Sequence, residues 1–306
     1  MSIIVTGASG SLGRQVTELL LEKVPPSEIT LVTRKPASLS AVAARGVHVR
    51  AGNFDEPETL VKAFAGGEKM LLISTLDVGP RRQRQHRAAI EAAAAAGAKH
   101  IVYTSTAGIH PRNPALSAAD HYATEEFLRR CGVAFTILRD SQYAEVIVTM
   151  LAPMAVRTGK WIMSTGDGCM AFVSKKDCAA SAAAVLTSPG HEGAVYEITG
   201  PALYSLHDAA AIASEVTGRP VEYVNLSSEE RQAMFDSLGM PRAYVAGSTN
   251  ADGTGTWGSE EIVSYERAIR EGYFSICSHH VKLITGRHAR PLREVYLENI
   301  DALKVD

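Results

Sequence analysis

The first half of the chain alternates short apolar runs with stretches in which apolar residues recur every three or four positions. A strand that is buried on both faces has a continuous apolar sequence, whereas a helix that packs on one side shows the longer period. Strands are therefore predicted at residues 3–5, 29–33, 47–49, 70–74, 100–105 and 134–138. Helices are predicted from residue 12, from residue 57, and at 81–97 and 123–131. Repeated strand–helix units favour a doubly wound parallel sheet with helices on both faces.

The alternation changes after about residue 145, where the helix signals come with polar caps. Ser205 with Asp208, and Ser227 with Glu230, have the spacing of a capping box, in which each side chain bonds the backbone N–H of the other residue. Further helices are predicted at residues 260–271, 279–284 and 291–303, and a long loop is predicted at 243–258. This part of the chain indicates a smaller, mainly helical lobe over the carboxyl edge of the sheet.

One segment of the second half is expected to return to the main sheet. Apolar residues 171–173 and 195–198 have the pattern of strands, and an alanine-rich helix lies between them. We therefore expect a Rossmann-type α/β domain over residues 1–150, with a return segment at 171–200, and a smaller helical lobe over 151–306.

A glycine pattern of the GxxGxxG type connects the first strand to the first helix. Gly7 can take backbone angles that a side chain would forbid, and Gly10 leaves room for a pyrophosphate beside the main chain. Gly13 allows the helix to pack closely on the sheet. The free N–H groups at the helix start and the helix dipole both favour an anion there. The predicted pyrophosphate site, for which an ordinary glycine-rich turn is the alternative, consists of Gly7, Ser9, Gly10, Ser11, Leu12 and Gly13.

The end of the second strand indicates which dinucleotide is bound. An acidic residue at this position hydrogen-bonds the ribose hydroxyl groups of NAD, whereas an arginine accommodates the 2′-phosphate of NADP. This chain has Thr33, Arg34 and Lys35 there and no acid. A guanidinium can hold a phosphate with two parallel hydrogen bonds and can stack on the adenine. Arg34 therefore predicts NADP(H) as the cofactor, with a solvated surface pair as the alternative.

Composition limits the partners of this 306-residue chain. Its formal net charge of −2 gives no electrostatic reason to expect binding to nucleic acid or to an anionic membrane. No apolar run has the length of a membrane span, and the chain enters a strand at once, so we expect no signal peptide. The four cysteines lie far apart, and no Cys/His spacing suggests a metal site. We expect a cytoplasmic protein that acts on a small molecule, with a homodimer as one option.

These motifs also carry a resemblance to a known family. Residues 5–13, Arg34 and the turn at 52–55 are similar to those of atypical short-chain dehydrogenases/reductases of the NmrA-like group. The similarity continues through residues 97–105, 121–125, 135–139, 283–287 and 291–294. Within the group, the chain resembles bacterial NADPH-dependent quinone oxidoreductases and triphenylmethane reductases. The resemblance implies a Rossmann-type fold, NADP(H) as the cofactor, and contact of Asn53 and Phe54 with the adenine.

Two further pairs of polar residues are expected to contact the cofactor. Ser74 and Thr75 follow the fourth strand, and Ser105 and Thr106 end the fifth. Ligands of open parallel sheets lie beyond the carboxyl ends of the strands, which places the nicotinamide and its ribose near these residues. The alternative is that the hydroxyl groups bond nearby backbone atoms.

The chain lacks the Tyr-x-x-x-Lys pair with which short-chain dehydrogenases usually transfer a proton. Tyr103 is followed four residues later by Ala107, and Tyr122 by Glu126. A quinone needs less help, because it is already electrophilic and the hydride comes from the nicotinamide. The resemblance places His121 where relatives that reduce phenolic ethers have a lysine.

His121 and Tyr143 are the candidate catalytic residues, and Trp161 is expected to flank the acceptor. A histidine can donate a proton near neutral pH or hold a substrate oxygen. The alternative for His121 is a surface or helix-capping role. The alternative for Tyr143 and Trp161 is packing in the core. We expect hydride transfer from NADPH to a quinone-like or conjugated aromatic acceptor. A redox sensor that binds NADP(H) without turnover, and a reductase of lignan- or isoflavonoid-type phenolics, are the alternatives.

A strongly basic run spans residues 81–87. We interpret it as a solvated helix face, which is the common role of such runs. Attraction of an anionic substrate or of the cofactor phosphates is the alternative.

Overall fold

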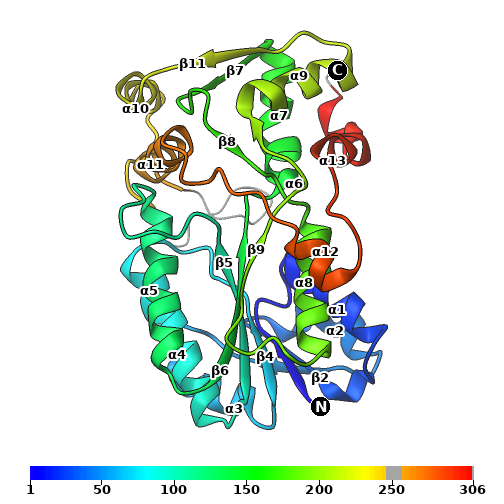
Figure 1. The fold of residues 1–306 in the computed structure, drawn as a ribbon. Helices are drawn as coiled ribbons and strands as arrows, with labels where there is room; N and C mark the ends of the chain where they lie inside the picture. Colours follow the sequence, from blue (N-terminus) through cyan, green and yellow to red (C-terminus); the bar gives the residue numbers. More distant parts are fainter. Residues whose placement is uncertain (246–256, 305–306) are drawn as a thin grey trace.

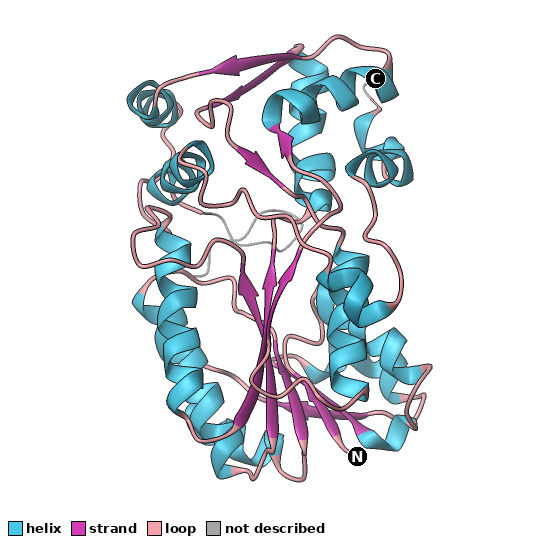
Figure 2. Ribbon diagram, viewed as in Figure 1, coloured by secondary structure: helices cyan, strands magenta, loops and turns pink. Residues whose placement is uncertain are grey.

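The computed structural model describes residues 1–245 and 257–304 and contains a seven-stranded sheet in the order β3-β2-β1-β4-β5-β6-β9. All neighbouring strands of this sheet pair in parallel (Figures 1 and 2). The strand order reverses between β1 and β4, which is the point at which ligands of such sheets bind. The strands are β1 Ile3–Val5, β2 Ile29–Thr33, β3 His48–Ala51, β4 Lys69–Leu72, β5 His100–Thr106, β6 Ala134–Asp140 and β9 Val195–Ile198.

Helices cover both faces of the sheet, which confirms the predicted doubly wound, Rossmann-type fold (Figure 1). Successive strand residues point to opposite faces, so Val102 joins the core beneath α1 and α8, while Ile101 and Tyr103 join the core beneath α3, α4 and α5. The first face carries α1 Ser11–Leu21, α2 Ser40–Ala43, α8 Lys175–Thr187 and α12 His280–Thr285; the second carries α3 Leu60–Phe64, α4 Pro80–Ala95 and α5 Leu116–Arg130. Single 3-10 turns lie at η1 Pro26–Glu28, η2 Pro36–Leu39, η3 Pro57–Thr59 and η5 Ile300–Leu303.

The remaining elements form a lobe with its own apolar core beyond the carboxyl ends of the strands (Figure 1). Two small sheets belong to it: β7 pairs with β11 in parallel, and β8 pairs with β10 in the antiparallel sense. Both predicted capping boxes are present, at the starts of α9 and α10. The elements are α6 Ala144–Val146, η4 Ile147–Leu151 (a π-helix), α7 Ala152–Thr158, β7 Lys160–Met163, β8 Cys169–Met170, β10 Tyr204–Ser205, α9 Leu206–Thr217, β11 Glu222–Asn225, α10 Ser228–Ser237, α11 Ser259–Arg270 and α13 Leu292–Glu298.

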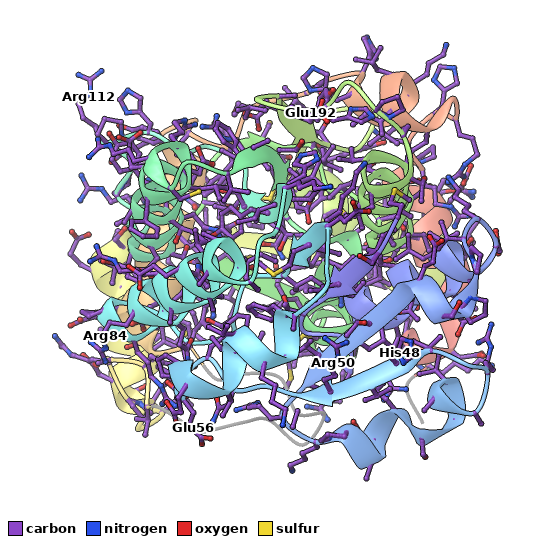
Figure 3. All side chains as sticks on the ribbon, turned by 90° about the horizontal axis from the view of Figure 1, so that it is seen from below. His48, Arg50, Glu56, Arg84, Arg112 and Glu192 are labelled. Atoms are coloured by element: carbon purple, nitrogen blue, oxygen red, sulfur yellow. The ribbon has the colours of Figure 1, made fainter. Side chains whose placement is uncertain are left out.

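The edge of the sheet at β3 is protected by charged side chains. His48 and Arg50 both lie on this outermost strand, which Figure 3 shows from below. Arg50 donates through Nη1 to the carbonyl oxygens of Ala63 and Ala65, at 3.1 and 2.6 Å, and so ties the strand to α3. Charged residues on an edge strand discourage pairing with another chain.

Two of the predicted elements differ from the structure in more than their end residues. Helix α5 begins at Leu116 rather than near residue 123. Residues 171–173 form no regular strand, because β6 ends at Asp140 and only an isolated bridge between Tyr143 and Val173 continues the pairing. Most of the predicted loop at 243–258 lies outside the described residues. Within the described part of the chain, no helix is long and apolar enough to cross a membrane.

Candidate functional site

The glycine turn after β1 is open to a ligand. Gly7 has a φ of +60°, a backbone conformation that favours glycine, and its carbonyl oxygen accepts a hydrogen bond of 3.0 Å from the N–H of Gly10. A Cβ atom on Gly13 would lie 2.5 Å from the Gly7 carbonyl oxygen, so only glycine permits this packing of α1. Gly10 caps α1 without a side-chain hydrogen bond, and the first turn contains no acidic residue. The first N–H groups of α1 are therefore available to a pyrophosphate, as predicted for this turn.

The residues expected at the adenine end of the cofactor lie together beside the glycine turn. Strand pairing sets Thr33 opposite Ala51, so Arg34 follows next to the turn that contains Asn53. The Thr33 hydroxyl donates to Oγ of Ser9 at 3.2 Å, which joins the end of β2 to the glycine turn. Arg34 itself is exposed and free to meet a phosphate.

A second arginine, which the sequence analysis missed, lies in the same place. Arg14 on α1 donates through Nε to the carbonyl oxygen of Ser9 at 2.9 Å and through Nη2 to that of Ser38 at 3.4 Å. Its position one residue after the last motif glycine is the signal that could have identified it. Arg14 and Arg34 together give this end of the site a positive charge that suits an additional phosphate.

The turn after β3 is held by local hydrogen bonds and by α4. The Asn53 amide donates to Oε1 of Glu56 at 2.9 Å, and its Oδ1 atom accepts from the N–H of Asp55. Phe54 packs against the core beneath α4. The hydrogen bond from Arg81, at 2.8 Å, lowers the pKa of the Asp55 carboxyl below its usual value.

The four hydroxyl residues expected beneath the nicotinamide differ in what they contact. The N–H of Ser74 donates to Oγ1 of Thr104 at 3.0 Å, and the Thr75 hydroxyl donates to Oε1 of Gln85 at 2.7 Å. The Ser105 hydroxyl donates to the buried carboxylate of Glu125 at 2.7 Å, so this side chain turns toward α5. Thr106, the last residue of β5, is half-buried at the carboxyl edge.

A buried polar cluster joins α4, α5 and the end of β4. The N–H of Thr75 donates to Nε2 of His86 at 3.0 Å, so this nitrogen is an acceptor. The Nδ1 atom of His86 then donates to Oγ1 of Thr124, 3.0 Å away, and the Thr124 hydroxyl donates to the Asp120 carbonyl. Burial, with a smaller effect of the Arg82 charge, lowers the pKa of His86 to about 3, so the ring is neutral.

The candidate His121 belongs to this cluster. Its Nδ1 atom lies 2.7 Å from the Tyr103 hydroxyl, and only 6% of the residue is exposed. Burial lowers the pKa of His121 well below its usual value, and the charge of Arg82 lowers it further.

Arg82 also belongs to this cluster, although the sequence pattern alone indicated a solvated residue at this position. Its guanidinium is buried, and its Nη1 atom lies 3.9 Å from Oδ2 of Asp120. Residues 82, 86, 89 and 93 of α4 are all buried. This helical spacing is the signal by which the buried member of the basic run could have been recognised.

The second catalytic candidate, Tyr143, lies on the other face of the sheet. Its hydroxyl donates to Oδ2 of Asp140 at 2.9 Å, and its ring packs with the core beneath α1 and α8. Burial raises the pKa of Asp140 to about 7. His121 packs on the α5 side, so the structure does not bring the two candidates together. Trp161 on β7 is 3% exposed and belongs to the core of the lobe.

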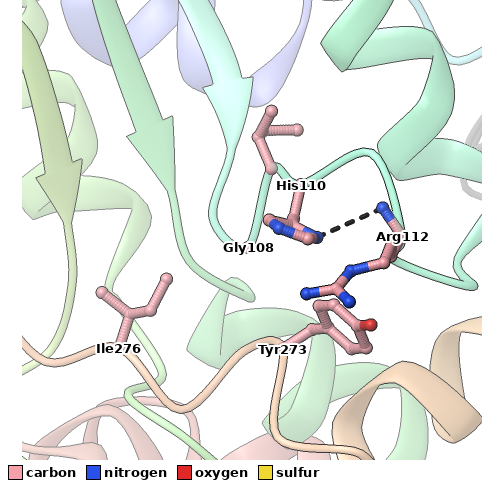
Figure 4. A pocket seen from close by; sticks show the side chains of 6 residues that line it. Gly108, His110, Arg112, Tyr273 and Ile276 are labelled. Carbon is pink, nitrogen blue, oxygen red and sulfur yellow. Dashed lines mark hydrogen bonds between the residues drawn. The ribbon is translucent and has the colours of Figure 1, made fainter.

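A cavity of about 360 Å³ lies just past the end of β5, between the connection to α5 and the connection from α11 to α12 (Figure 4). The rings of His110 and Tyr273 lie 5.9 Å apart at its wall, and the Arg112 N–H donates to Nδ1 of His110 at 3.2 Å. A second hollow of about 480 Å³ lies between α10 and α11 in the lobe. The described residues contain no group of three or more His, Cys, Asp or Glu side chains arranged to hold a metal ion.

Comparison with known proteins shows the family of the chain. A family model described as NAD(P)H-binding matches residues 7–189. Quinone oxidoreductase 2 of Escherichia coli is 41% identical over 240 residues, which cover 78% of this chain and 82% of that protein. An NmrA-like family domain-containing oxidoreductase of Aspergillus flavus is 30% identical over 98% of this chain and 97% of its own length. The chain belongs to the NAD(P)H-binding family, and the predicted resemblance to NmrA-like oxidoreductases is confirmed.

Solved structures agree with this assignment. An NADPH-dependent quinone oxidoreductase of Escherichia coli in complex with NADPH superposes with a TM-score of 0.87 at 35% identity, over 97% of this chain and 99% of that one. A triphenylmethane reductase of Citrobacter sp. in complex with NADP(H) gives a TM-score of 0.82 at 32% identity, also over 97% and 99%. The expected cofactor, NADP(H), is confirmed.

Proposed function

We propose that the protein is an NADPH-dependent reductase that transfers a hydride directly to a quinone-like or conjugated aromatic acceptor. The observation that carries the proposal is a complete dinucleotide-binding turn combined with a sheet edge that lacks a tyrosine–lysine pair. Among the described residues, Tyr103 bonds His121 and Tyr143 bonds Asp140, and no lysine bonds either hydroxyl. Carbonyl reduction depends on such a pair, whereas an electrophilic acceptor depends mainly on placement beside the cofactor.

The names of the relatives support the same class of acceptor. They include a quinone oxidoreductase, an NAD(P)H azoreductase of Xenophilus azovorans that is 32% identical over 79% of this chain, and a triphenylmethane reductase. Quinones, azo dyes and triphenylmethane dyes are all conjugated and electron-poor. A reductase for such acceptors fits this chain better than a sensor without turnover.

The proposed reaction assigns cofactor-binding and acceptor-binding roles to different residues. The N–H groups at the start of α1, with Gly7, Ser9, Gly10, Ser11, Leu12 and Gly13, hold the pyrophosphate, and Arg34 holds the 2′-phosphate. Asn53 and Phe54 contact the adenine, and Ser74, Thr75 and Thr106 place the nicotinamide at the edge of the sheet. Bound NADPH supplies the hydride. His121, kept neutral by burial, orders the acceptor oxygen, and Tyr143 is the second candidate for this role.

Ser105 contributes to the site indirectly in this proposal. Its hydroxyl is fully engaged with Glu125, which also accepts hydrogen bonds from Arg129 and Arg139. The residue thus fixes the end of β5 against α5, while its backbone remains at the edge where the cofactor binds.

An acceptor panel tests the proposal. Purified protein and NADPH are mixed with one acceptor at a time (1,4-benzoquinone, an azo dye, a triphenylmethane dye, or a lignan- or isoflavonoid-type phenolic), and the loss of nicotinamide absorbance is followed. We expect turnover with the quinone and with at least one dye. Tight NADPH binding with no loss of absorbance for any acceptor would favour the redox sensor. Turnover confined to lignan- or isoflavonoid-type phenolics, abolished in His121→Ala, would favour that alternative.

Three further features belong to the proposal. The boundary near residue 150 separates the dinucleotide-binding part from a substrate-binding lobe, with residues 171–200 supplying α8 and β9 to the former; the separate core of the lobe supports this. A cytoplasmic location fits four cysteines that are all free. A homodimer remains a prediction, which light scattering on the purified protein tests.

A further inference from the structure

The basic run at the start of α4 contains one arginine that is not solvated. Arg84 and Arg87 are exposed, as expected for a solvated helix face, whereas Arg82 is only 4% exposed. Helix α4 begins at Pro80, directly after the connection from β4, so Arg82 lies in its first turn, near the carboxyl edge of the sheet. One turn later, His86 bonds the N–H of Thr75 at that edge. Arg82 is therefore placed in the layer where cofactor and acceptor meet.

Two buried nitrogen atoms of the Arg82 guanidinium lack a hydrogen-bond partner in the part of the chain that the structure describes. Its Nε and Nη1 atoms are buried without a hydrogen-bond partner among residues 1–245 and 257–304. The carboxylate beside it, Asp120, is 3.9 Å away, which is too far for a hydrogen bond. Both Asp120 oxygens are already occupied, one by the N–H of Gly79 at 2.6 Å and the other by the amide of Gln83 at 2.8 Å.

The charges of Asp120 and Asp77 favour the charged form of Arg82, but no neighbour among the described residues accepts a hydrogen bond from its Nε or Nη1 atom. His86 is neutral and bonds Thr124. His121 is also neutral and bonds the buried hydroxyl of Tyr103. Buried N–H groups without a hydrogen-bond partner are uncommon in native proteins, and an oxygen atom of a ligand can supply the missing partner. An anionic or strongly polar oxygen atom could therefore accept hydrogen bonds from the free N–H groups of Arg82.

We propose that Arg82 is the anion-binding group of the acceptor site, and that its free N–H groups receive the acceptor oxygen that becomes negative during reduction. This inference rests on the proposed reductase function. A quinone that takes up a hydride becomes a quinol monoanion, and the electron pair comes from the reduced nicotinamide, which is oxidised. The negative charge develops on the quinone oxygen beside the guanidinium, and a proton from water then completes the quinol. A fixed cation at this position stabilises the charge where it develops.

The substitution Arg82→Met tests the role, with Arg84→Met on the exposed side of the same helix as the matched control. NADPH-loaded protein is mixed with 1,4-benzoquinone in a stopped-flow instrument. We expect Arg82→Met to lower the rate of hydride transfer about 100-fold or more, which is the usual effect of losing one oxyanion donor. Its melting temperature is measured alongside, because removing one partner of the buried Arg82–Asp120 pair lowers stability, and the rate is compared only under conditions in which the variant is folded. Arg84→Met should match the parent in both measurements.

Anion binding can be measured independently of hydride transfer with a phenol that does not accept a hydride. 4-Nitrophenol is titrated in the presence of NADP⁺-loaded protein, and the phenolate band is measured. A neighbouring cation favours the phenolate, so it should bind about tenfold or more tightly than the neutral phenol, and Arg82→Met should abolish the preference.

Each outcome decides the question. A rate of Arg82→Met equal to that of Arg84→Met overturns the proposal, as does the absence of a phenolate preference in the parent protein. A phenolate preference that depends on Arg82, without hydride transfer to any acceptor, leaves the anion site standing and removes the reductase function. If Arg82→Met does not fold, Arg82→Gln takes its place, with the same expected loss of rate and of phenolate preference.

Discussion

The Tyr103 hydroxyl on β5 lies 2.7 Å from Nδ1 of His121 on α5. This hydrogen bond joins β5 to the helix that covers it. The two residues are eighteen positions apart in the sequence, so no local motif predicts that they form a pair.

Replacing Tyr103 with Phe should destabilise the protein and slow it. The substitution leaves the buried Nδ1 atom of His121 without its hydrogen-bond partner, which costs about 1–3 kcal/mol of unfolding free energy. The ring also loses its fixed orientation, so the hydride-transfer rate should fall. Urea unfolding measures the first effect and acceptor turnover the second. Tyr122→Phe, at an exposed tyrosine on the same helix, is the control and should change neither. An unchanged urea midpoint in Tyr103→Phe would contradict the described hydrogen bond.

Arg34→Ala should separate the two nicotinamide cofactors. Loss of a charged hydrogen bond to the 2′-phosphate removes about 1.5–3 kcal/mol, or roughly 10- to 100-fold in the dissociation constant of NADPH. NADH lacks that phosphate, so its affinity should be nearly unchanged. Fluorescence titration of the two reduced cofactors measures the difference. Equal losses for NADPH and NADH would show that Arg34 supports the fold of the site and does not select the cofactor.

The glycine turn allows stability and binding to be separated. A Cβ atom at Gly13 would lie 2.5 Å from the Gly7 carbonyl oxygen and 2.7 Å from Cα of Ala8, so Gly13→Ala must displace α1. We expect a loss of about 1–3 kcal/mol in unfolding free energy together with weaker NADPH binding. At Gly10 the nearest such contact is 3.2 Å and φ is negative, so Gly10→Ala should keep the stability and lose only the binding. A Gly13→Ala variant as stable as the parent would contradict the close packing.

Two buried groups should give opposite pH dependences of stability. Asp140 has a pKa of about 7 in the folded protein against an ordinary value of 3.8, so its contribution is fully present below about pH 4 and is lost as the pH rises toward 7. His86 has a pKa of about 3 against 6.5, so its contribution is present above pH 6.5 and is lost as the pH falls toward 3. Each slope is at most about 1.4 kcal/mol per pH unit.

Substitutions separate these two slopes. Asp140→Asn should leave a protein whose unfolding free energy falls more steeply on acidification from pH 7 to pH 4, because only the histidine contribution remains. His86→Gln should shift the dependence the other way, although His121, whose pKa is also lowered, retains part of it. Urea unfolding at intervals between pH 4 and pH 8 measures both. Parallel curves for the parent and Asp140→Asn would show that this carboxyl is ionised in the folded protein throughout the range.

The sequence predicts those features of the site that rest on local pattern. The strand, glycine turn and helix around Gly7 and Gly13 are contiguous, and each residue's role follows from its neighbours in the chain. The hydrogen-bond partner of Ser105, in contrast, cannot be predicted from its neighbours in the chain. The position of Ser105 at a strand end is visible in the sequence, but its partner Glu125 is reached only when α5 packs on the sheet. The same holds for Arg82, because a run of like charges hides the helical period that buries one member.

The most direct test of the central claim is a single-turnover measurement of hydride transfer. Protein loaded with NADPH, or with NADPH deuterated at C4 of the nicotinamide, is mixed with excess 1,4-benzoquinone, and nicotinamide absorbance is followed in a stopped-flow instrument. We predict a single rapid loss of absorbance in the bound cofactor that is slower for the deuterated form. Bound NADPH that keeps its absorbance in the presence of the quinone would contradict the assignment of this protein as a reductase.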